Sequence, residues 1–71
     1  MNRNNPIATF VREQRKQRGI TQEEFAILSG VSLSFLRALE QGKETLQIDN
    51  VNRVLRMFNY EVGPIPIKKK L

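Results

Sequence analysis

The sequence predicts a single all-α domain of four short helices, followed by an extended C-terminal segment. Apolar residues recur at helical spacing in four separate stretches, and a glycine or an asparagine follows each stretch as a stop signal. The chain has 71 residues, of which 39% are hydrophobic, and this suits one folded domain with a single modest core. We expect a flexible arm over residues 1–5, a helical domain over 6–59, and an extended strand with a basic tail over 60–71.

The first helix is predicted over residues 6–18. Asn5 precedes it as a cap, and Pro6 takes the first helical position, where its missing N–H costs nothing. Gly19 follows as the stop signal. The apolar face of this helix consists of Ile7, Phe10 and Val11.

The second and third helices are predicted over residues 22–29 and 33–41, joined by a very short turn. Thr21 and Glu24 have the spacing of a capping box, in which each side chain satisfies a backbone N–H of the other residue. Gly30 stands where a helix takes a left-handed C-terminal residue, and Ser32 is a second N-cap. A connection of about three or four residues is typical of a helix-turn-helix. The apolar positions at helical spacing are Phe25, Ala26 and Leu28 in one helix and Leu36 and Leu39 in the other.

A fourth helix is predicted over residues 48–58, with Asn59 as its stop signal. Its apolar positions keep the helical period, and they are Ile48, Val51, Val54, Leu55 and Phe58. The segment after it, YEVGPIPI at 60–67, has β-branched and aromatic residues, two prolines and no helical period, so we expect it to be extended.

The charge and the missing residue types narrow the function. Twelve Lys and Arg against seven Asp and Glu give a net charge of +5, which favours a polyanionic partner, although a merely soluble basic surface is the plain alternative. The chain has no Cys and no His, so we expect no disulfide, no metal site and no cofactor. A nucleophile–base pair cannot be assembled either, so we do not expect an enzyme. The polar start and the lack of a long apolar run indicate no signal peptide and no membrane span, and we expect a cytoplasmic protein. No small-molecule ligand is indicated.

The motifs GITQEEFA at 19–26, SGVS at 29–32 and LEQGK at 39–43 carry a family resemblance. Their spacing resembles that of the lambda-repressor/Cro-type helix-turn-helix domains, also described as xenobiotic-response-element-like regulators, over roughly residues 7–60. In that family the second helix crosses the DNA backbone and the third lies in the major groove. The resemblance therefore implies a sequence-specific DNA-binding transcriptional repressor.

The same resemblance implies roles for individual residues. Gln22 matches a residue that binds a phosphate, and Lys43 matches a backbone-contacting lysine. Arg15 and Glu40 match a pair that forms a salt bridge in some members of the family. The positions of the third helix that reach base edges are Ser32, Leu33, Ser34 and Arg37.

Helical geometry agrees with part of this assignment. If Leu36 and Leu39 face the core, Ser34 and Arg37 turn outward together. Arg37 is the only cation on the third helix, and Arg can bind guanine bidentately, so we expect it to be the chief specificity residue. The alternatives are an ordinary surface arginine at 37, a capping role alone for Ser32, and an exposed Leu33 without function.

The sequence departs from the family pattern in three places: at Phe35, at Leu46, which replaces a common proline, and in the extended tail, which replaces a fifth helix. Phe35 stands where small polar residues are usual, and it has three options: packing within the domain, against DNA sugars, or against a partner. The tail resembles instead the C-terminal strands of the HipB antitoxins, which pair across a dimer. Pro64 and Pro66 remove backbone donors from one edge of such a strand, so that only the other edge can pair. The expected dimer interface is Tyr60, Val62 and Ile65, and the alternative is a frayed tail.

The HipB resemblance implies an antitoxin that represses its own operon from a palindromic operator and binds a HipA-like kinase toxin. The nearer rival is a stand-alone or phage-type transcriptional regulator. A protein-interaction module that has lost DNA binding is the rival from another class. No site is assigned to Lys68, Lys69 and Lys70.

Overall fold

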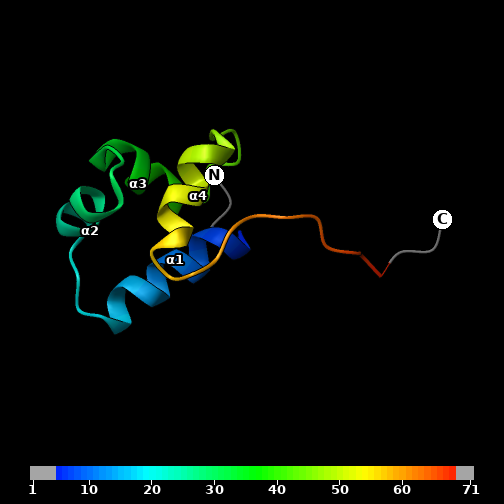
Figure 1. Ribbon diagram of the computed structural model, residues 1–71, viewed down its shortest axis with the longest axis horizontal. Coiled ribbons are helices and arrows are strands. Elements are labelled where there is room, and N and C mark those ends of the chain that lie inside the picture. Colours follow the sequence, from blue (N-terminus) through cyan, green and yellow to red (C-terminus); the bar gives the residue numbers. More distant parts are fainter. Residues whose placement is uncertain (1–4, 69–71) are drawn as a thin grey trace.

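The computed structural model describes residues 5–68, and these form four helices around one core. The helices are α1 (Pro6–Gln17), α2 (Gln22–Ser29), α3 (Leu33–Glu40) and α4 (Ile48–Arg56). They pack into one compact body, and the tail leaves it as a long extended segment (Figure 1). The prediction of a four-helix, all-α domain is therefore confirmed. The predicted C-terminal strand is not present in the single chain, because residues 60–68 run without a second strand to pair with.

Side chains cap three of the four helix starts, as the sequence predicts. Asn5 Oδ1 accepts hydrogen bonds from the amides of Ile7 (2.9 Å) and Ala8 (3.2 Å) at the start of α1. Thr21 and Glu24 form the capping box of α2, with reciprocal bonds of 3.0 and 3.1 Å. Because Thr21 donates its backbone N–H to the Glu24 carboxylate, the pKa of Glu24 lies below its ordinary value.

Left-handed residues follow the helices where the stop signals stand. Gly30 has a φ of 77° at the end of α2, and Asn59 has a φ of 64° after α4. Three predicted helices extend one or two residues beyond the observed ends, because their last predicted residues lie in the turns that follow the helices. At the end of α4, for example, the amide of Phe58 donates to Leu55 O at 2.9 Å.

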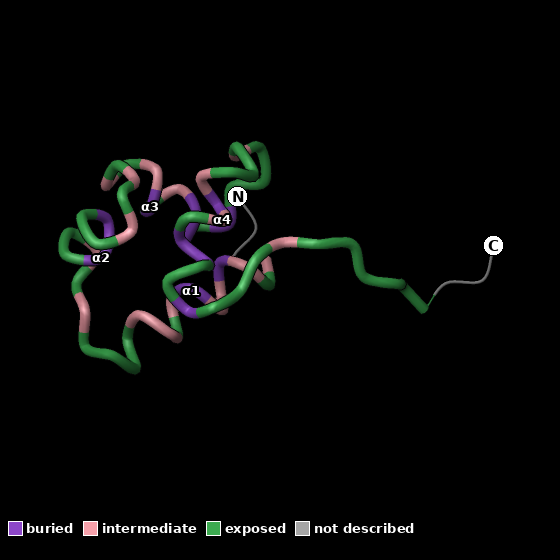
Figure 2. The backbone as a smooth tube through the Cα atoms, in the orientation of Figure 1, coloured by how far each residue is buried: buried purple, intermediate pink, exposed green. Residues whose placement is uncertain are grey.

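The core lies where the four helices meet (Figure 2). Its largest fully buried side chains are Phe25, Leu36, Val11 and Val54. Phe58 stacks on Phe25, with ring centroids 5.2 Å apart, so the turn after α4 closes one side of the core. Two residues expected on apolar faces are instead exposed, Leu28 (59%) and Ile48 (64%). α2 is short and turns only Phe25 and Ala26 fully inward, while Ile48 begins α4 beyond the core's edge.

Within residues 60–68, only the beginning of the tail is attached to the domain. The amide of Tyr60 donates to Leu55 O (3.1 Å), and the amide of Val62 donates to Asn52 Oδ1 (2.8 Å). The Tyr60 ring contacts that of Phe10, with centroids 4.6 Å apart. Beyond Val62 every residue up to 68 is exposed, and Figure 1 shows this part running away from the helices.

Candidate nucleic-acid interface

The connection between α2 and α3 is a tight three-residue turn, Gly30 to Ser32. The amides of Gly30 (3.0 Å) and Val31 (3.2 Å) both donate to Ala26 O, which closes the last turn of α2. Arg53 on α4 supports the turn from outside, since its Nη1 donates to Gly30 O at 3.3 Å. α2 and α3 are thereby held in a helix-turn-helix arrangement, with α1 and α4 beside them (Figure 1).

α3 divides into a buried face and an exposed face. Leu36 and Leu39 are 0% and 4% exposed, whereas Ser34 and Arg37 lie on the surface. The helical period alone predicted this division. Within residues 5–68 Arg37 makes no ion pair, so its guanidinium is available to an external partner. On this face, the Arg37 guanidinium can offer several N–H donors and Ser34 can offer a hydroxyl to the edge of a base.

The start of α3 is used mainly for its own structure. Ser32 Oγ accepts a hydrogen bond from the Phe35 amide (3.0 Å) and lies 3.3 Å from Ser34 Oγ. Ser32 and Ser34 are exposed, but Leu33 is half-buried and packs against the core. Phe35 packs against the core as well, which is the first of its three options. Of the four residues predicted to contact bases, Ser32, Ser34 and Arg37 are therefore exposed, whereas Leu33 is partly covered by the core.

Arg15 and Glu40, singled out from the sequence, meet in a buried ion pair between α1 and α3. Arg15 Nε and Nη2 donate to the two carboxylate oxygens of Glu40, at 2.8 and 3.0 Å. The side chains are only 12% and 3% exposed. The carboxylate holds the pKa of Arg15 above its ordinary value, because its hydrogen bonds stabilise the charged form by more than burial destabilises it. Arg15 Nη1 also donates to Ile20 O (2.8 Å), which attaches the α1–α2 connection to the pair.

Gln22, the predicted phosphate ligand, is half-buried at the start of α2 and belongs to the same network. Its Nε2 donates to Glu40 Oε1 at 3.1 Å. The start of α2, the end of α3 and the last turn of α1 are thus joined through one carboxylate. Lys43, the predicted backbone contact, lies exposed just after α3, where its amide donates to Ala38 O at 3.1 Å.

Two residues of this region were not singled out from the sequence. Arg12 on α1 donates from Nη1 to the main-chain oxygen of Glu40, and Arg53 supports the turn. Arg12 lies 28 residues and Arg53 lies 23 residues from its partner along the chain, so no local pattern marks them. For Arg12 the available signal was its place beside the cations Arg15, Lys16 and Arg18 in the sequence, and no such signal marks Arg53.

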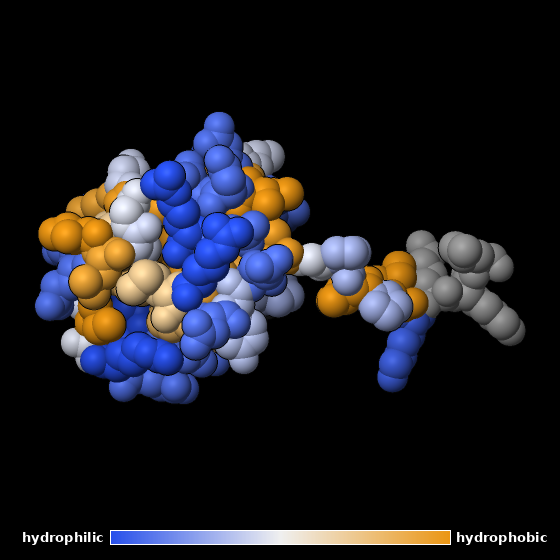
Figure 3. Space-filling view, viewed as in Figure 1, coloured by the Kyte–Doolittle hydropathy of each residue, from blue (hydrophilic) through white to orange (hydrophobic). Residues whose placement is uncertain are grey.

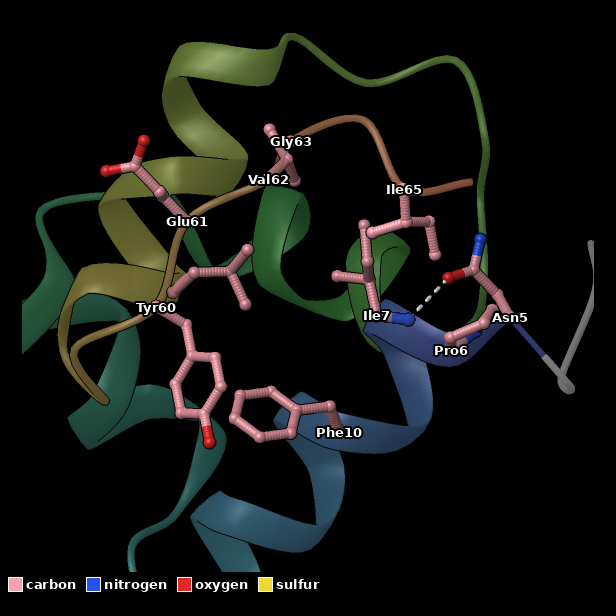
Figure 4. Close-up of a pocket in the computed structure, with 10 residues that line it drawn as sticks. Asn5, Pro6, Ile7, Phe10, Tyr60, Glu61, Val62, Gly63 and Ile65 are labelled. Carbon is pink, nitrogen blue, oxygen red and sulfur yellow. Dashed lines mark hydrogen bonds between the residues drawn. The ribbon is translucent and has the colours of Figure 1, made fainter. Parts of the chain in front are cut away.

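The predicted dimer-interface residues lie away from α3, around a groove between the tail and α1 (Figure 4). The groove has a volume of about 440 Å³. Tyr60 and Val62 contact their own domain, whereas Ile65 is 80% exposed and points toward the start of α1. Lys68 is exposed, and Lys69 and Lys70 lie outside the described residues.

Residues 5–68 offer no metal site and no membrane-spanning helix. This part of the chain contains no cluster of three or more acidic, His or Cys side chains placed to hold a metal ion. None of its helices is long and apolar enough to cross a lipid bilayer. Figure 3 shows mostly hydrophilic surface on one face, with a hydrophobic area over α2, where Ile27 is 81% exposed.

Comparison with known proteins agrees with this geometry. A helix-turn-helix family model matches residues 11–65. A protein of Sinorhizobium fredii, named as an uncharacterized HTH-type transcriptional regulator y4mF, is 44% identical over 56 residues, which are 79% of this chain and 74% of that protein. A similarly named protein of Methanothermobacter thermautotrophicus is 38% identical over 55 residues, or 78% of this chain and 80% of that protein. With α2, the Gly30 turn and α3 inside the matched range, the chain belongs to the helix-turn-helix family.

Proposed function

We propose that this protein is a transcriptional regulator that binds DNA sequence-specifically and acts as a repressor. The observation that carries the proposal is the exposed face of α3, where Ser34 and Arg37 stand clear of the core on a helix fixed at both ends. The family assignment and the positive charge support it, since a cationic helix-turn-helix domain suits a major groove lined by phosphates. Relatives named as HTH-type transcriptional regulators point the same way.

In this proposal each predicted contact residue has a distinct task. Arg37 reads a guanine through O6 and N7, and Ser34 contacts a neighbouring base edge. Gln22 and Lys43 bind backbone phosphates and so orient the domain. Ser32 caps α3 and reaches the DNA through its exposed hydroxyl. Leu33 meets a thymine methyl only through the part of its side chain that the core leaves uncovered.

Substitution of Arg37 tests the assignment of base reading. Arg37→Ala should cost about 1–3 kcal/mol in discrimination at one base position, because the bidentate contact is lost. Arg37→Lys should lose nearly as much discrimination while keeping the charge, since an ammonium lacks the planar fork. The measurement is a mobility-shift titration against the operator and its single-base variants. Arg56→Ala, in the last turn of α4, is the matched control and should leave discrimination unchanged.

The operator itself is found by selecting bound DNA from a random pool. A consensus sequence supports a sequence-specific regulator. No preference by the wild-type protein would contradict the proposal and favour the rival, an interaction module that keeps the fold without DNA binding. The exposed Ile27 and the neighbouring Leu28 are the surface that favours this rival.

We further propose that the protein works as a homodimer joined through its tail. In an extended segment the amides of Val62, Pro64 and Pro66 belong to one edge. The Val62 amide is already bound to Asn52, and the prolines have no N–H, so this edge offers no donor for pairing. The opposite edge carries the exposed residues Glu61, Gly63, Ile65 and Ile67.

A strand with one usable edge pairs once, and two identical strands that pair antiparallel form a closed two-fold dimer. Such pairing would cover the groove beside α1 and the isoleucines at 65 and 67, which are 80% and 72% exposed. Two copies of α3 would then read half-sites about 34 Å apart, one helical turn of DNA. The consensus selected from the random pool should therefore be palindromic. A single asymmetric half-site would contradict the dimer without contradicting DNA binding.

A more specific role, an antitoxin of the HipB kind, is favoured only by the tail. In that role the protein represses its own operon and binds a HipA-like kinase toxin. A gene for such a kinase next to the gene for this protein, and a stable complex of the two products, are the expected findings. With no such neighbour, the stand-alone or phage-type regulator is the better reading.

A further inference from the structure

The groove between the tail and α1 is lined mostly by apolar side chains and has open space at one position. Ile7 and Phe10 line it from α1, and Ile65 lines it from the tail (Figure 4). Gly63 also lines it, and a Cβ placed on Gly63 would meet no atom within 4 Å. The groove therefore has room beside Gly63 for an additional apolar side chain.

A second tail, paired with the free edge of the first, would bring one of its own side chains to this position. Successive residues of an extended segment alternate between two faces, so Gly63 and Ile65 share the face that borders the groove. In an antiparallel pair, directly opposed residues project to the same face. The residue of the second copy that lies opposite Gly63 would therefore project over the groove.

The pairing pattern restricts which residue this can be. The free edge of each tail carries Glu61, Gly63, Ile65 and Ile67, and its residues pair with residues of the same edge in the second copy. A glycine opposite Gly63 would leave the groove empty, and Glu61 there would bring a carboxylate into apolar surroundings. The two isoleucines remain.

Charge distinguishes these two isoleucines. Glu61 is the one charged residue among those that line the groove. With Ile65 opposite Gly63, Glu61 would face the apolar Ile67 of the second copy. With Ile67 opposite Gly63, Glu61 comes opposite Lys69, which lies outside the described residues. Opposite charges directly across an antiparallel pair stabilise it, and two-fold symmetry supplies this pair twice.

The direction of the tail also favours Ile67. The tail runs outward from the helical domain (Figure 1), so an antiparallel second tail runs inward, toward the groove. Ile67 is 72% exposed and does not line the groove of its own copy. A second copy is therefore the partner that can cover it.

From this arrangement we infer that the groove beside α1 is the binding site for Ile67 of a second copy, in an antiparallel pair with Ile65 on the two-fold axis. The inference rests on the proposed homodimer and adds its register and the side chain that completes each groove. Each copy supplies one Ile67 and receives one. Because α1 forms one wall of the groove, this contact also fixes the paired tails against both helical domains.

Cross-linking through introduced cysteines tests the register, and the natural chain has no Cys to interfere. Ile65→Cys should form a disulfide-linked dimer rapidly on mild oxidation, because opposed residues have Cα atoms about 5.5 Å apart, within disulfide range. Gly63→Cys and Ile67→Cys should each cross-link slowly alone and rapidly in an equimolar mixture. Gel electrophoresis without reductant measures the rates.

Truncation of the inserted side chain tests the groove itself. Ile67→Ala should raise the dimer dissociation constant on the order of a hundredfold, because two buried side chains are shortened in each dimer. Ile27→Ala on α2, where the isoleucine is 81% exposed, is the matched control and should leave the constant unchanged. Sedimentation over a range of concentrations measures both.

The outcomes separate this inference from the proposed homodimer. A wild-type protein that stays monomeric at all concentrations would overturn the homodimer and the register together. A wild-type dimer in which Gly63→Cys cross-links fastest alone, or fastest when mixed with Ile65→Cys, would overturn only the register. A dissociation constant that Ile67→Ala leaves unchanged, or that Ile27→Ala raises equally, would overturn the assignment of Ile67 to the groove.

Discussion

Glu40 is a buried carboxylate on which three helices converge. Arg15 from α1 and Gln22 from α2 bind its two oxygens, and Arg12 donates to its main-chain oxygen. A buried charge of this kind is tolerated because each of its oxygen atoms accepts at least one hydrogen bond. Through this residue the orientation of α3 depends on α1, although α1 lies outside the helix-turn-helix.

Removing the charge of Glu40 should destabilise the domain. Glu40→Gln leaves the guanidinium of Arg15 buried without its counter-charge, and we expect a loss of about 3 kcal/mol in the free energy of unfolding. For a domain of this size that is a large share of its total stability. Urea denaturation measures the change. Glu13→Gln, on the exposed side of α1, is the matched control and should shift stability by less than about 0.5 kcal/mol. A Glu40 variant as stable as that control would show that the pair contributes little.

At the scale of the elements, short helices depend on their ends. α2 and α3 have eight residues each, too few to be stable alone, so their caps and their packing must hold them. Thr21 and Ser32 cap their starts, and Gly30 allows the chain to reverse between them. The turn is also supported by Arg53, so its geometry depends on α4 as well.

Gly30→Ala tests the need for a left-handed residue in the turn. A Cβ at Gly30 would have room, since its nearest neighbour, Arg53 Nη1, would lie 3.8 Å away. The cost therefore comes from the left-handed backbone conformation. We expect the free energy of unfolding to fall by about 1–2 kcal/mol, measured by thermal unfolding.

Gly63→Ala is the matched control, because that glycine has open space around it and no left-handed backbone. It should leave the stability of the domain unchanged. If both alanine variants unfold at the wild-type temperature, the left-handed conformation at Gly30 costs an alanine nothing.

At the scale of the whole molecule, the protein is a compact domain with an extended tail. The tail is fixed at its start by the Tyr60–Phe10 ring contact and by the Val62–Asn52 hydrogen bond. These contacts choose the direction in which the tail leaves the domain, and they block one edge of it. The proposed dimer therefore depends on a polar side chain of α4 that does not itself reach the second copy.

Asn52→Ala should weaken the dimer without unfolding the domain. Loss of the bond to the Val62 amide frees the tail, and we expect the dimer dissociation constant to rise roughly tenfold, in line with the net value of one hydrogen bond. Sedimentation across a range of protein concentrations measures the change.

Asn50→Ala, on the same helix and without a contact to the tail, serves as the control. A wild-type protein that stays monomeric at all concentrations would contradict the dimer itself. A wild-type dimer with an unchanged constant in Asn52→Ala would contradict only the role of Asn52.

Much of the fold was predictable because its signals are local. The caps at Asn5, Thr21 and Ser32 and the left-handed Gly30 and Asn59 each depend on residues within one helical turn. The division of α3 into buried and exposed faces followed from helical period in the same way. The exposure of Leu28 and Ile48 was not predicted, because the helical period alone does not say where the core ends. The partial burial of Leu33 was not predicted for the same reason. The boundary of the core is set by Phe25, Leu36 and their neighbours, which come from different helices.

By itself, the sequence determined the four helices, the turn between α2 and α3, and which side chains of α3 could face outward. These properties follow from backbone geometry over a few residues. Only the tertiary structure decided that the Arg15–Glu40 pair is buried and shared with Gln22, that Arg12 and Lys16 border a pocket at the end of α3, and that Asn52 binds the Val62 amide. Those arrangements join residues ten or more positions apart, and the packing of the helices around one core brings them together.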